Sequence, residues 1–289
     1  MTTDRMFRRA SYLSVFLTFA RNSLVRNMMF RANFLIECVS SVTWTMMNLG
    51  FYLLIFRYTS SIGKNTGWGE WEFFAFLATT MLVNSLVQAF FMPNCEEISE
   101  LIRTGGLDFA LLKPIDTQFL ISLEKVDWSS LANFLAGCVL LIVSLFHLTT
   151  HPENPIHITP LTVVFYVFYV LCGVAILYSL MIGLSATSIW LGQNSSLYDF
   201  WFYITNFSRY PMEIYSGSYG TPLRVAFTYI VPILIVVNVP AQVIARPIAP
   251  DGSSVWPLAV FALVATVGSL AASRFVFVSA LKSYRSASS

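Results

Sequence analysis

The sequence feature that most constrains the fold is a stretch of 45 residues, Asn154 to Tyr198, without a single Asp, Glu, Lys or Arg. Most of it is apolar, and Leu161 to Trp190 can form one helix of about 45 Å at the α-helical rise. This length exceeds the hydrocarbon core of a bilayer, which is about 30 Å thick, so such a helix must tilt or project into water. The stretch therefore predicts a membrane-spanning helix rather than part of a soluble domain.

The composition extends this prediction to the whole chain. Of the 289 residues, 56% are hydrophobic and 11% are charged, and the mean hydropathy is positive, whereas soluble domains carry about 25% charged residues. A net charge of +2 gives no reason to expect a nucleic-acid partner. The four cysteines form no CxxC or Cys/His spacing, so we expect neither a disulfide framework nor a metal site. We predict an all-α integral membrane protein with a single domain over residues 1–289.

The apolar runs predict six transmembrane helices. We place them at about residues 33–56, 71–92, 126–148 and 161–190, with a short fifth span beginning at 197–207 and a last one at 255–276. Residues 1–31 precede these spans and combine arginines with aromatic residues, which predicts an interfacial helix lying on an anionic leaflet. The apolar run within them is short and is followed by more arginines, unlike a cleaved signal peptide.

The segment from Arg209 to Asp251 is the least regular part of the chain, because it holds six of the 12 prolines. Its apolar run is interrupted by Pro232, Asn238 and Pro240. Broken backbone at membrane depth is tolerated only where protein buries it or water reaches it. We predict a re-entrant helical pair on the outer side, and the alternative is a kinked seventh crossing.

Basic residues set the predicted topology. With six crossings, 12 of the 17 lysines and arginines fall on the side that carries residues 1–31, the loop around 93–126 and the tail at 277–289. The positive-inside rule then makes both termini cytoplasmic. A seventh crossing would put the three basic residues near the C-terminus outside, which counts against it.

The polar interruption at 93–118 contains a predicted short amphipathic helix. Asn94 can cap it, with Glu97 three residues on to complete a capping box, and Gly105 and Gly106 can end it. One narrow apolar face follows the helical period, and charged residues cover the rest of the surface. The face comprises Ile98, Leu101 and Ile102, and the charged side comprises Glu96, Glu97, Glu100 and Arg103. Taken by itself, this helix either lies solvated on the headgroups or docks another protein.

Few residues suggest chemistry. No phosphate-binding Walker loop occurs, because Gly63-Lys64 lacks the preceding glycine, and no metal or nucleophile motif occurs. His147, His151 and His157 gather at one predicted outer loop, where an ordinary wet loop and a zinc site are the alternatives. We therefore predict no catalytic residues in this chain.

Four residues are candidates for a substrate path. Glu37 is an acid inside the first span, where a charge faces protein or water; it either pairs with Arg26 or Arg31 or lines a cavity for a polar or cationic substrate. Trp44, on the same span, belongs to the aromatic residues that could line such a path. Arg209 and Tyr210 serve either as a helix stop with interfacial anchors or as a part of a binding site.

The order of these features resembles the permease subunits of ABC type-2 exporters, in particular a bacterial branch that reads I-R-x-G-x-L-D-x-x-L-L-(K/R)-P in the first cytoplasmic loop. The loop motif is matched by Ile102, Arg103, Gly105, Leu107, Asp108, Leu111, Leu112, Lys113 and Pro114. Downstream positions of the branch are matched by Phe207, Arg209, Tyr210, Pro211, Ile214 and Tyr215, and then by Val231, Pro232, Pro240 and Ala241.

The resemblance implies a fold and partners. It implies a multi-pass protein of the bacterial cytoplasmic (inner) membrane that pairs with a second permease, identical or a sister subunit. Two copies of a separate ABC ATP-binding subunit would dock on the cytoplasmic side and would hold the ATP and Mg, so this chain itself would bind no cofactor. The helix at 94–104 would be the coupling helix, and the coupling residues would be Glu97, Ile98, Glu100, Leu101, Ile102, Arg103, Leu107 and Asp108.

The predicted function is therefore that of a transport subunit of an ATP-driven exporter and not that of an enzyme. Branch relatives suggest drug-like compounds, or lipid and glycan material; Glu37 and the aromatic residues favour a hydrophobic or cationic xenobiotic. Two other classes remain as alternatives. A secondary transporter would show internal repeats and more charges within its spans, and a membrane enzyme on a lipid-linked substrate would need the outer-loop histidines.

Overall fold

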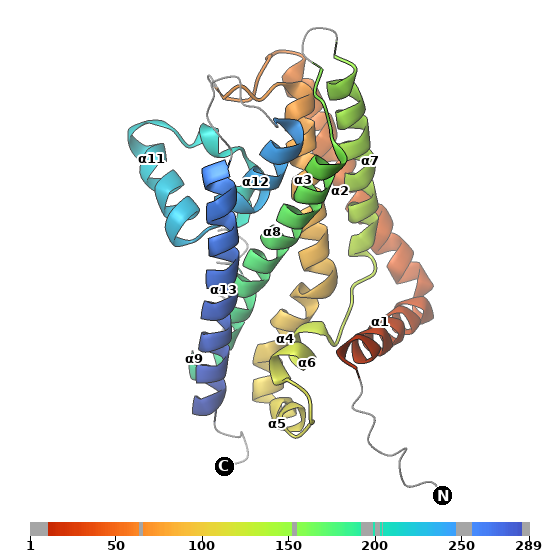
Figure 1. The fold of residues 1–289 in the computed structure, drawn as a ribbon. Coiled ribbons are helices and arrows are strands. Elements are labelled where there is room, and N and C mark those ends of the chain that lie inside the picture. The colour runs from red at the N-terminus through yellow and green to blue at the C-terminus, as the bar shows by residue number, and fades with distance from the viewer. Residues whose placement is uncertain are drawn as a thin grey trace, which may run out of the picture.

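A computed structural model describes residues 11–63, 66–151, 155–191, 199, 203, 205–246 and 256–284, and every regular element within these ranges is helical. The long helices form an elongated bundle (Figure 1). In the described residues, five helical units are long and apolar enough to cross a membrane. They are α2 (Arg31–Phe56), α3 (Glu70–Phe90) with α4 (Met92–Arg103), α7 (Ser130–Thr149), α8 (Pro160–Ala186) with α9 (Ser188–Leu191), and α13 (Trp256–Ser283).

Five of the six predicted spans correspond to these units, and the predicted fifth span at 197–207 lies mostly outside the described residues. Two helix ends differ from the predicted span boundaries. The helix α7 begins at Ser130 rather than near 126, because the Asp127 carboxylate accepts hydrogen bonds from Ser129 and Ser130 and forms a turn there. The helix α13 continues to Ser283, so the first residues of the predicted tail at 277–289 are helical. Phe277 and Ala280 are buried there, which stabilises this extension.

The helix α3 forms the centre of the bundle and contacts α7, α8 and α12 (Leu234–Ala245). Its aromatic residues Phe73, Phe74 and Phe76 are fully buried. The helix α2, in contrast, has no buried residue and packs along one side only, mainly against α7. In Figure 1 the long helix α8 runs obliquely across the bundle.

Two glycines allow close helix crossings. A Cβ atom on Gly173 of α8 would lie 2.6 Å from the backbone oxygen of Val236 in α12, and one on Gly137 of α7 would lie 3.2 Å from the Met81 Cβ in α3. The first distance is shorter than real Cβ contacts, so only glycine lets α8 and α12 approach this closely. The helix α12 is consequently buried on almost all sides.

The proline-rich segment folds as a bent pair. A helix α11 (Gly217–Val225) continues as one π-helical turn, η3 (Ala226–Ile230), and then meets α12 at an angle of 89°. Pro232 lies in the bend, where its missing N–H and fixed φ interrupt the helix. Both a broken span and a re-entrant loop have this shape, so the re-entrant arrangement stays a prediction.

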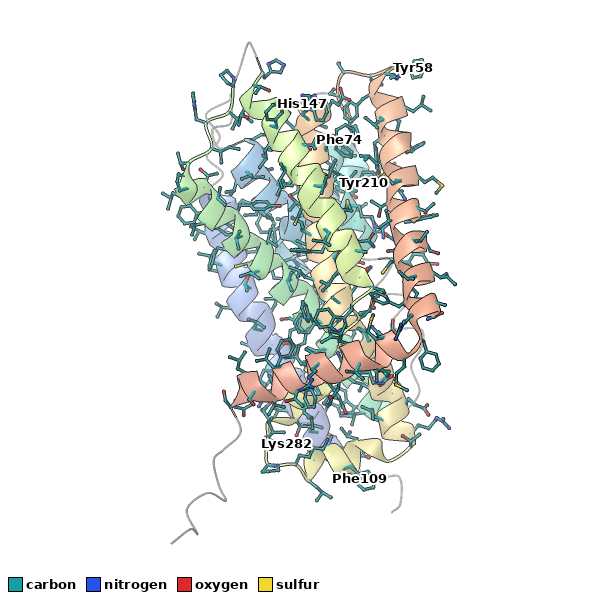
Figure 2. The ribbon with its side chains drawn as sticks, turned by 90° about the vertical axis from the view of Figure 1, so that its right-hand side faces the viewer. Tyr58, Phe74, Phe109, His147, Tyr210 and Lys282 are labelled. Atoms are coloured by element: carbon teal, nitrogen blue, oxygen red, sulfur yellow. The ribbon has the colours of Figure 1, made fainter. Side chains whose placement is uncertain are left out.

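The two ends of the bundle differ, and we name each by one helix. The α5 end carries α1 (Tyr12–Met29), α5 (Gly106–Leu111), α6 (Thr117–Leu123) and the C-terminal end of α13; the α12 end carries the C-terminus of α12 and the loop before α3. Figure 2 shows α1 lying across the bundle near the α5 end, where Phe109 and Lys282 also lie. This crosswise helix is the segment predicted to lie in the interface. The α5 end is the side that basic residues predict to be cytoplasmic.

Candidate functional site

The predicted capping role of Asn94 is wrong. Only Phe91 separates α3 from α4, so no free helix start exists at Asn94 that would need a cap. Its buried side chain instead donates to the carbonyl oxygens of Phe90 (2.9 Å) and Lys125 (2.8 Å) and accepts from the Lys125 backbone amide (2.8 Å). Glu97, predicted to complete the box, forms an ion pair with the Lys125 ammonium. Both residues therefore fasten α4 to the segment that leads into α7.

The apolar face of α4 is already occupied by the chain itself. Ile98 is 1% exposed, and Leu101 and Ile102 pack against the same core. The hydroxyl of Ser99 donates to that of Ser188 in α9 at 3.0 Å, which holds α4 beside the end of α8. The Ile98 side chain therefore has almost no exposed surface in this structure, and the docking of this helix to a partner stays a prediction.

In the loop between α4 and α6, exposed large apolar residues lie on α5 and the turn after it. Gly105 has φ of +72°, in the left-handed region, and ends α4 as predicted. The chain then forms α5, in which Leu107 is 1% exposed and points into the core while Phe109 is 72% and Leu112 is 81% exposed. Figure 2 shows Phe109 at the extreme of the bundle. We call Phe109 and Leu112 the apolar tip.

The apolar tip was missed in the sequence because a six-residue helix is too short to show a 3.6-residue period. The available signal was the density of large apolar residues in the polar loop, four between positions 107 and 112. Only one of them, Leu107, is fully buried. An apolar run that a short helix cannot bury is an indication of an exposed patch.

Contacts from α13 hold the loop that carries α5. The Arg274 guanidinium donates to both oxygens of the Asp116 carboxylate, at 3.1 and 2.5 Å, and to the side-chain oxygen of Gln118 at 2.9 Å. Asp116 also caps α6 by accepting from the Phe119 amide at 3.0 Å. Partial burial acts to raise the pKa of the Asp116 carboxyl, but the bonds from Arg274 and the backbone outweigh it and lower the pKa. The ionised form is therefore favoured in the folded protein.

A second contact joins α5 to the end of α13. Burial raises the pKa of the Tyr284 hydroxyl, and the neighbouring Asp108 carboxylate raises the pKa further. Asp108, a predicted coupling residue, thus faces the chain's own C-terminal segment. Arg274 and Tyr284 therefore both connect the C-terminal part of the chain to the loop that carries the apolar tip.

Glu100 and Arg103 form an exposed pair on α4, with an N–O distance of 2.6 Å. The hydrogen bond from Arg103 lowers the pKa of Glu100. Exposed pairs of this kind contribute little to stability. Both side chains stay accessible for a partner, in contrast to Ile98.

The helix α1 is tied to the α5 end by two hydrogen bonds. Its buried Ser23 hydroxyl accepts from the Val126 amide at 3.1 Å, and the Trp128 indole donates to the Ala20 carbonyl oxygen at 3.2 Å. These bonds fix the middle of α1 against the segment that precedes α7. They give the crosswise position of α1 a specific cause.

The structure places the predicted path residues in two groups. Glu37 and Trp44 lie on α2, and both are exposed. Glu37 accepts a hydrogen bond from Asn33 at 2.6 Å, and the pairing with Arg26 or Arg31, one of the alternatives considered, is not seen among the described residues. Tyr210 lies close to Tyr52, further along α2, and Figure 2 shows Tyr210 on the side of the bundle near α2. Both groups therefore border α2, the most weakly packed helix of the five spanning units.

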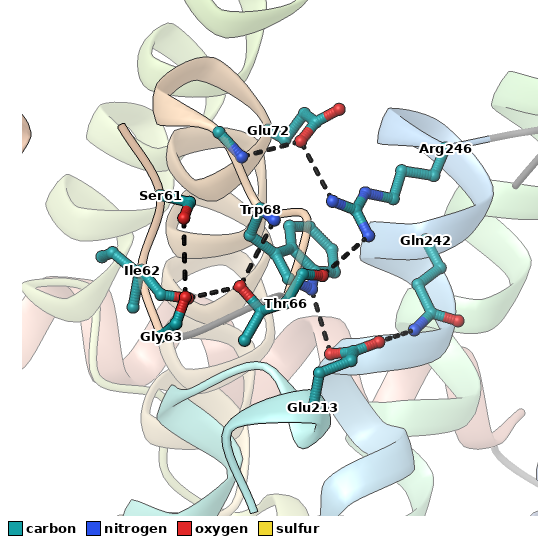
Figure 3. A network of polar contacts seen from close by, with 10 residues as sticks. Ser61, Ile62, Gly63, Thr66, Trp68, Glu72, Glu213, Gln242 and Arg246 are labelled. Atoms are coloured by element: carbon teal, nitrogen blue, oxygen red, sulfur yellow. Dashed lines mark hydrogen bonds and ion pairs between the residues drawn. The ribbon is translucent and has the colours of Figure 1, made fainter. Parts of the chain in front are cut away.

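A polar network that the sequence analysis missed closes the α12 end (Figure 3). The Arg246 guanidinium donates to the Glu72 carboxylate at 3.1 Å and lies 4.4 Å from the ring centre of Trp68. The indole of Trp68, which is fully buried, donates to Glu213 at 3.0 Å, and Gln242 donates to the other oxygen of Glu213 at 2.9 Å. We call these five residues the α12-end network.

The α12-end network joins three segments that are far apart in the sequence. They are the loop before α3 with the first turn of α3, the turn η2 (Met212–Ile214) and the C-terminus of α12. The same turn is held from inside by the buried Asn238, whose side chain accepts from the Met212 amide at 2.8 Å. The available sequence signal was only that Glu72, Glu213 and Arg246 flank apolar runs, which does not indicate that they meet.

The histidines at the end of α7 and in the loop after it do not support a metal site. In the described part of the chain, no group of three or more His, Cys, Asp or Glu side chains lies close enough to hold a metal ion. His147 instead stacks on Trp71, with ring centres 3.8 Å apart. The zinc alternative considered for this loop therefore has no geometric basis among these residues.

These features define the class of the protein. Several long apolar helices, a short exposed helix at one end and a bent pair at the other describe a multi-pass membrane protein. The sequence matches the ABC-2 family transporter proteins over residues 42–288, and the chain belongs to this family. It is thus the membrane component of a transport system, a permease that associates with ATP-binding subunits. No curated protein and no solved structure matched the chain.

Proposed function

We propose that this chain is the permease subunit of an ATP-driven exporter and that the apolar tip is its docking site for the ATP-binding subunit. The observation that supports this most directly is the exposure of Phe109 and Leu112 on a loop helix at the end of the bundle. Large apolar side chains gathered outside the spanning helices are typical of an interaction surface. The favoured occupant is the ATPase, because a permease without a nucleotide-binding motif needs a partner to supply energy.

The predicted coupling residues then divide into two roles. Glu97, Ile98, Leu101, Ile102 and Leu107 hold the tip on the bundle, and Asp108 links it to α13. Glu100 and Arg103 are exposed and contribute to the register of the docked partner. Two copies of the ATPase would bind a pair of permeases, and closure of the ATPase dimer would move the tips and shift the permeases between two arrangements.

The second permease, an identical copy or a sister subunit, would cover α2. The helix α2 has no buried residue and carries polar side chains within its span, among them Glu37, Asn48 and the pair Ser41 and Thr45 that contacts Asn133 of α7. Polar side chains within a span face protein or a water-filled path. We therefore place the substrate path along α2, with Glu37 and Trp44 toward the α5 end and Arg209 and Tyr210 farther from it.

The test of docking compares an apolar and a charged substitution at Phe109. The tagged wild type, expressed from its native gene neighbourhood, is purified in mild detergent, and we expect an ATPase subunit and ATP hydrolysis in the eluate. Phe109→Leu keeps an apolar tip and should retain both, whereas Phe109→Asp should insert normally and lose the ATPase. Equal recovery of the ATPase with Phe109→Asp would contradict docking at the tip, and wild type recovered alone, without ATPase activity, would contradict the exporter function itself.

The proposed substrate is a hydrophobic or cationic drug-like compound, with export of lipid or glycan material as the second candidate. The observation that favours a cation is the accessibility of Glu37, whose carboxylate is bonded only by a neutral amide among the contacts described. Glu37→Gln should then weaken cellular resistance to cationic compounds more than resistance to neutral compounds of similar size. An equal loss for both groups would count against a role for Glu37 in substrate choice.

A further inference from the structure

A groove of about 530 Å³ lies between α6, α8 and α13, beside the junction of α3 and α4. It is separate from the apolar tip and from the proposed substrate path along α2. One end of the groove is polar and the other is apolar. We call it the α6–α8–α13 groove.

The polar end contains both signs of charge. The Arg274 guanidinium is bound to the Asp116 carboxylate, and the two side chains are 49% and 33% exposed. Gln118 bridges this pair to α8, because its oxygen accepts from Arg274 at 2.9 Å and its amide donates to the Tyr178 hydroxyl at 3.0 Å. The Ser122 hydroxyl lies 2.9 Å from the same hydroxyl. A rigid cluster with zero net charge thus faces the groove.

The apolar end is formed by α8. Leu171, Val174 and Ala175 line the groove over the two turns that precede Tyr178, and Phe91 closes it from the α3–α4 junction. Leu171 and Tyr178 are seven positions apart, which is about 10 Å along the helix. The groove can therefore hold the polar group of an amphiphile and the first part of an alkyl chain.

The depth of the groove corresponds to a headgroup region. On α13, Trp256 and Arg274 are 18 residues apart, or about 27 Å along the helix axis, close to the thickness of the hydrocarbon core, about 30 Å. Tryptophan is enriched at membrane interfaces, and long basic side chains near helix ends reach toward the headgroups. With Trp256 at one interface, Arg274 lies at the other, in the leaflet on the side of the α5 end.

We propose that the α6–α8–α13 groove binds a zwitterionic membrane phospholipid with a primary amine, of the phosphatidylethanolamine type. The phosphate would accept hydrogen bonds from Arg274, and the ammonium group would lie against the Asp116 carboxylate. Arg274 uses three of the five N–H donors of a guanidinium in the bonds described, so donors remain for a phosphate. A lipid with net negative charge has no ammonium group in its headgroup to place against the Asp116 carboxylate. This proposal does not depend on the ATP-binding partner.

The test measures lipid retention by the full-length protein. Purified, delipidated protein is incubated with an equimolar mixture of phosphatidylethanolamine and phosphatidylglycerol with the same acyl chains, and retained lipid is identified by native mass spectrometry. We expect a preference for phosphatidylethanolamine of about tenfold, the factor that one hydrogen bond to a charged group provides. Equal retention of both lipids by the wild type would overturn the proposal.

Three variants localise the site. Ala175→Trp fills the groove and should remove the preferential retention, whereas Val167→Trp, on the exposed face of the same helix and outside the groove, should leave it unchanged. Asp116→Asn should keep lipid binding but lose the preference for the amine headgroup. An unchanged preference in Ala175→Trp or in Asp116→Asn would overturn the assignment, and since these two variants alter different parts of the groove, a folding defect in one leaves the other as a test.

Discussion

The two ends of this permease differ in how far their polar and apolar side chains find partners within the chain. At the α12 end, Arg246, Glu72, Trp68, Glu213 and Gln242 are bonded to one another, and the side chains of the ion pair are 18% and 26% exposed. At the α5 end, the ion pairs are more exposed, and large apolar side chains protrude from the bundle. Among the described residues, the polar network of the α12 end finds its partners within one chain, whereas the α5 end has exposed surfaces that a partner can cover.

This difference predicts that the property altered by a substitution, subunit stability or association with the ATPase, depends on the end at which it is made. A substitution at the α12 end should alter the stability of the isolated subunit, because its contacts are internal. A substitution at the apolar tip should leave that stability unchanged and alter the association with the ATPase. Measuring both properties for the same variants separates the two ends.

The largest effect is expected where α8 crosses α12. Gly173→Ala places a Cβ 2.6 Å from the Val236 backbone oxygen, and the crossing must open to avoid it. Overpacking of this kind costs about 3 kcal/mol of unfolding free energy. The measurement is the unfolding midpoint in detergent, with Gly183→Ala as control, since no atom lies within 4 Å of the Cβ position there. If both variants unfold alike, the close crossing does not exist in the protein.

A smaller loss is expected when the α12-end network is broken. Arg246→Gln leaves the Glu72 carboxylate without its cation and removes the contact with Trp68, at a cost of about 2 kcal/mol, below that of a fully buried pair. The double variant Glu72→Gln/Arg246→Gln should recover part of this stability, because no unpaired charge then remains. A double variant as unstable as the sum of the single ones would contradict coupling between the two residues.

The corresponding pair at the α5 end should matter less. Arg274→Gln should cost about 1 kcal/mol or less, because both partners are substantially exposed. The pKa of Asp116 is lowered in the folded protein, so the stabilisation by its ionised form is complete above the unfolded-state pKa of about 3.9 and is lost as the pH falls through the folded-state pKa. Unfolding midpoints of wild type and Arg274→Gln should therefore converge at low pH, and a constant difference would argue against the ion pair.

The smallest effect is expected for the exposed pair on α4. Glu100→Gln should leave the unfolding midpoint of the isolated subunit unchanged, since both side chains of the pair are open to water. The same variant should weaken recovery of the ATPase if Glu100 contributes to docking. A clear loss of subunit stability would show that this end is more tightly bonded than the structure indicates.

The sequence predicted the spanning helices well because membrane insertion requires long apolar runs that are visible residue by residue. The spans at 33–56, 71–92 and 161–190 differ from the observed helices by a few residues at most, and Gly105 ends α4 as its conformational freedom predicted. The segment at 209–251 was also correctly read as broken, although its crossing of the membrane stays a prediction.

The candidate site was harder to predict, because it depends on contacts between distant segments. The periodicity of Ile98, Leu101 and Ile102 correctly indicated an apolar face but could not show that α8 and α9 cover it. Asn94 has the composition of a cap, yet the continuation of α3 into α4 gives it another role. The meeting of Arg246 with Glu72 joins positions 174 residues apart, and no local pattern encodes such a contact.

The continuity of α3 and α4 has a mechanical consequence. From Glu70 to Arg103 the unit has 34 residues and is about 50 Å long at the α-helical rise. One end of this rod lies beside Trp68 and the Glu72–Arg246 pair, and the other end lies one glycine turn before the helix with the apolar tip. A displacement of the tip would therefore act on one end of a helical unit that reaches the opposite end of the bundle, and Phe91 marks the junction between its two helices.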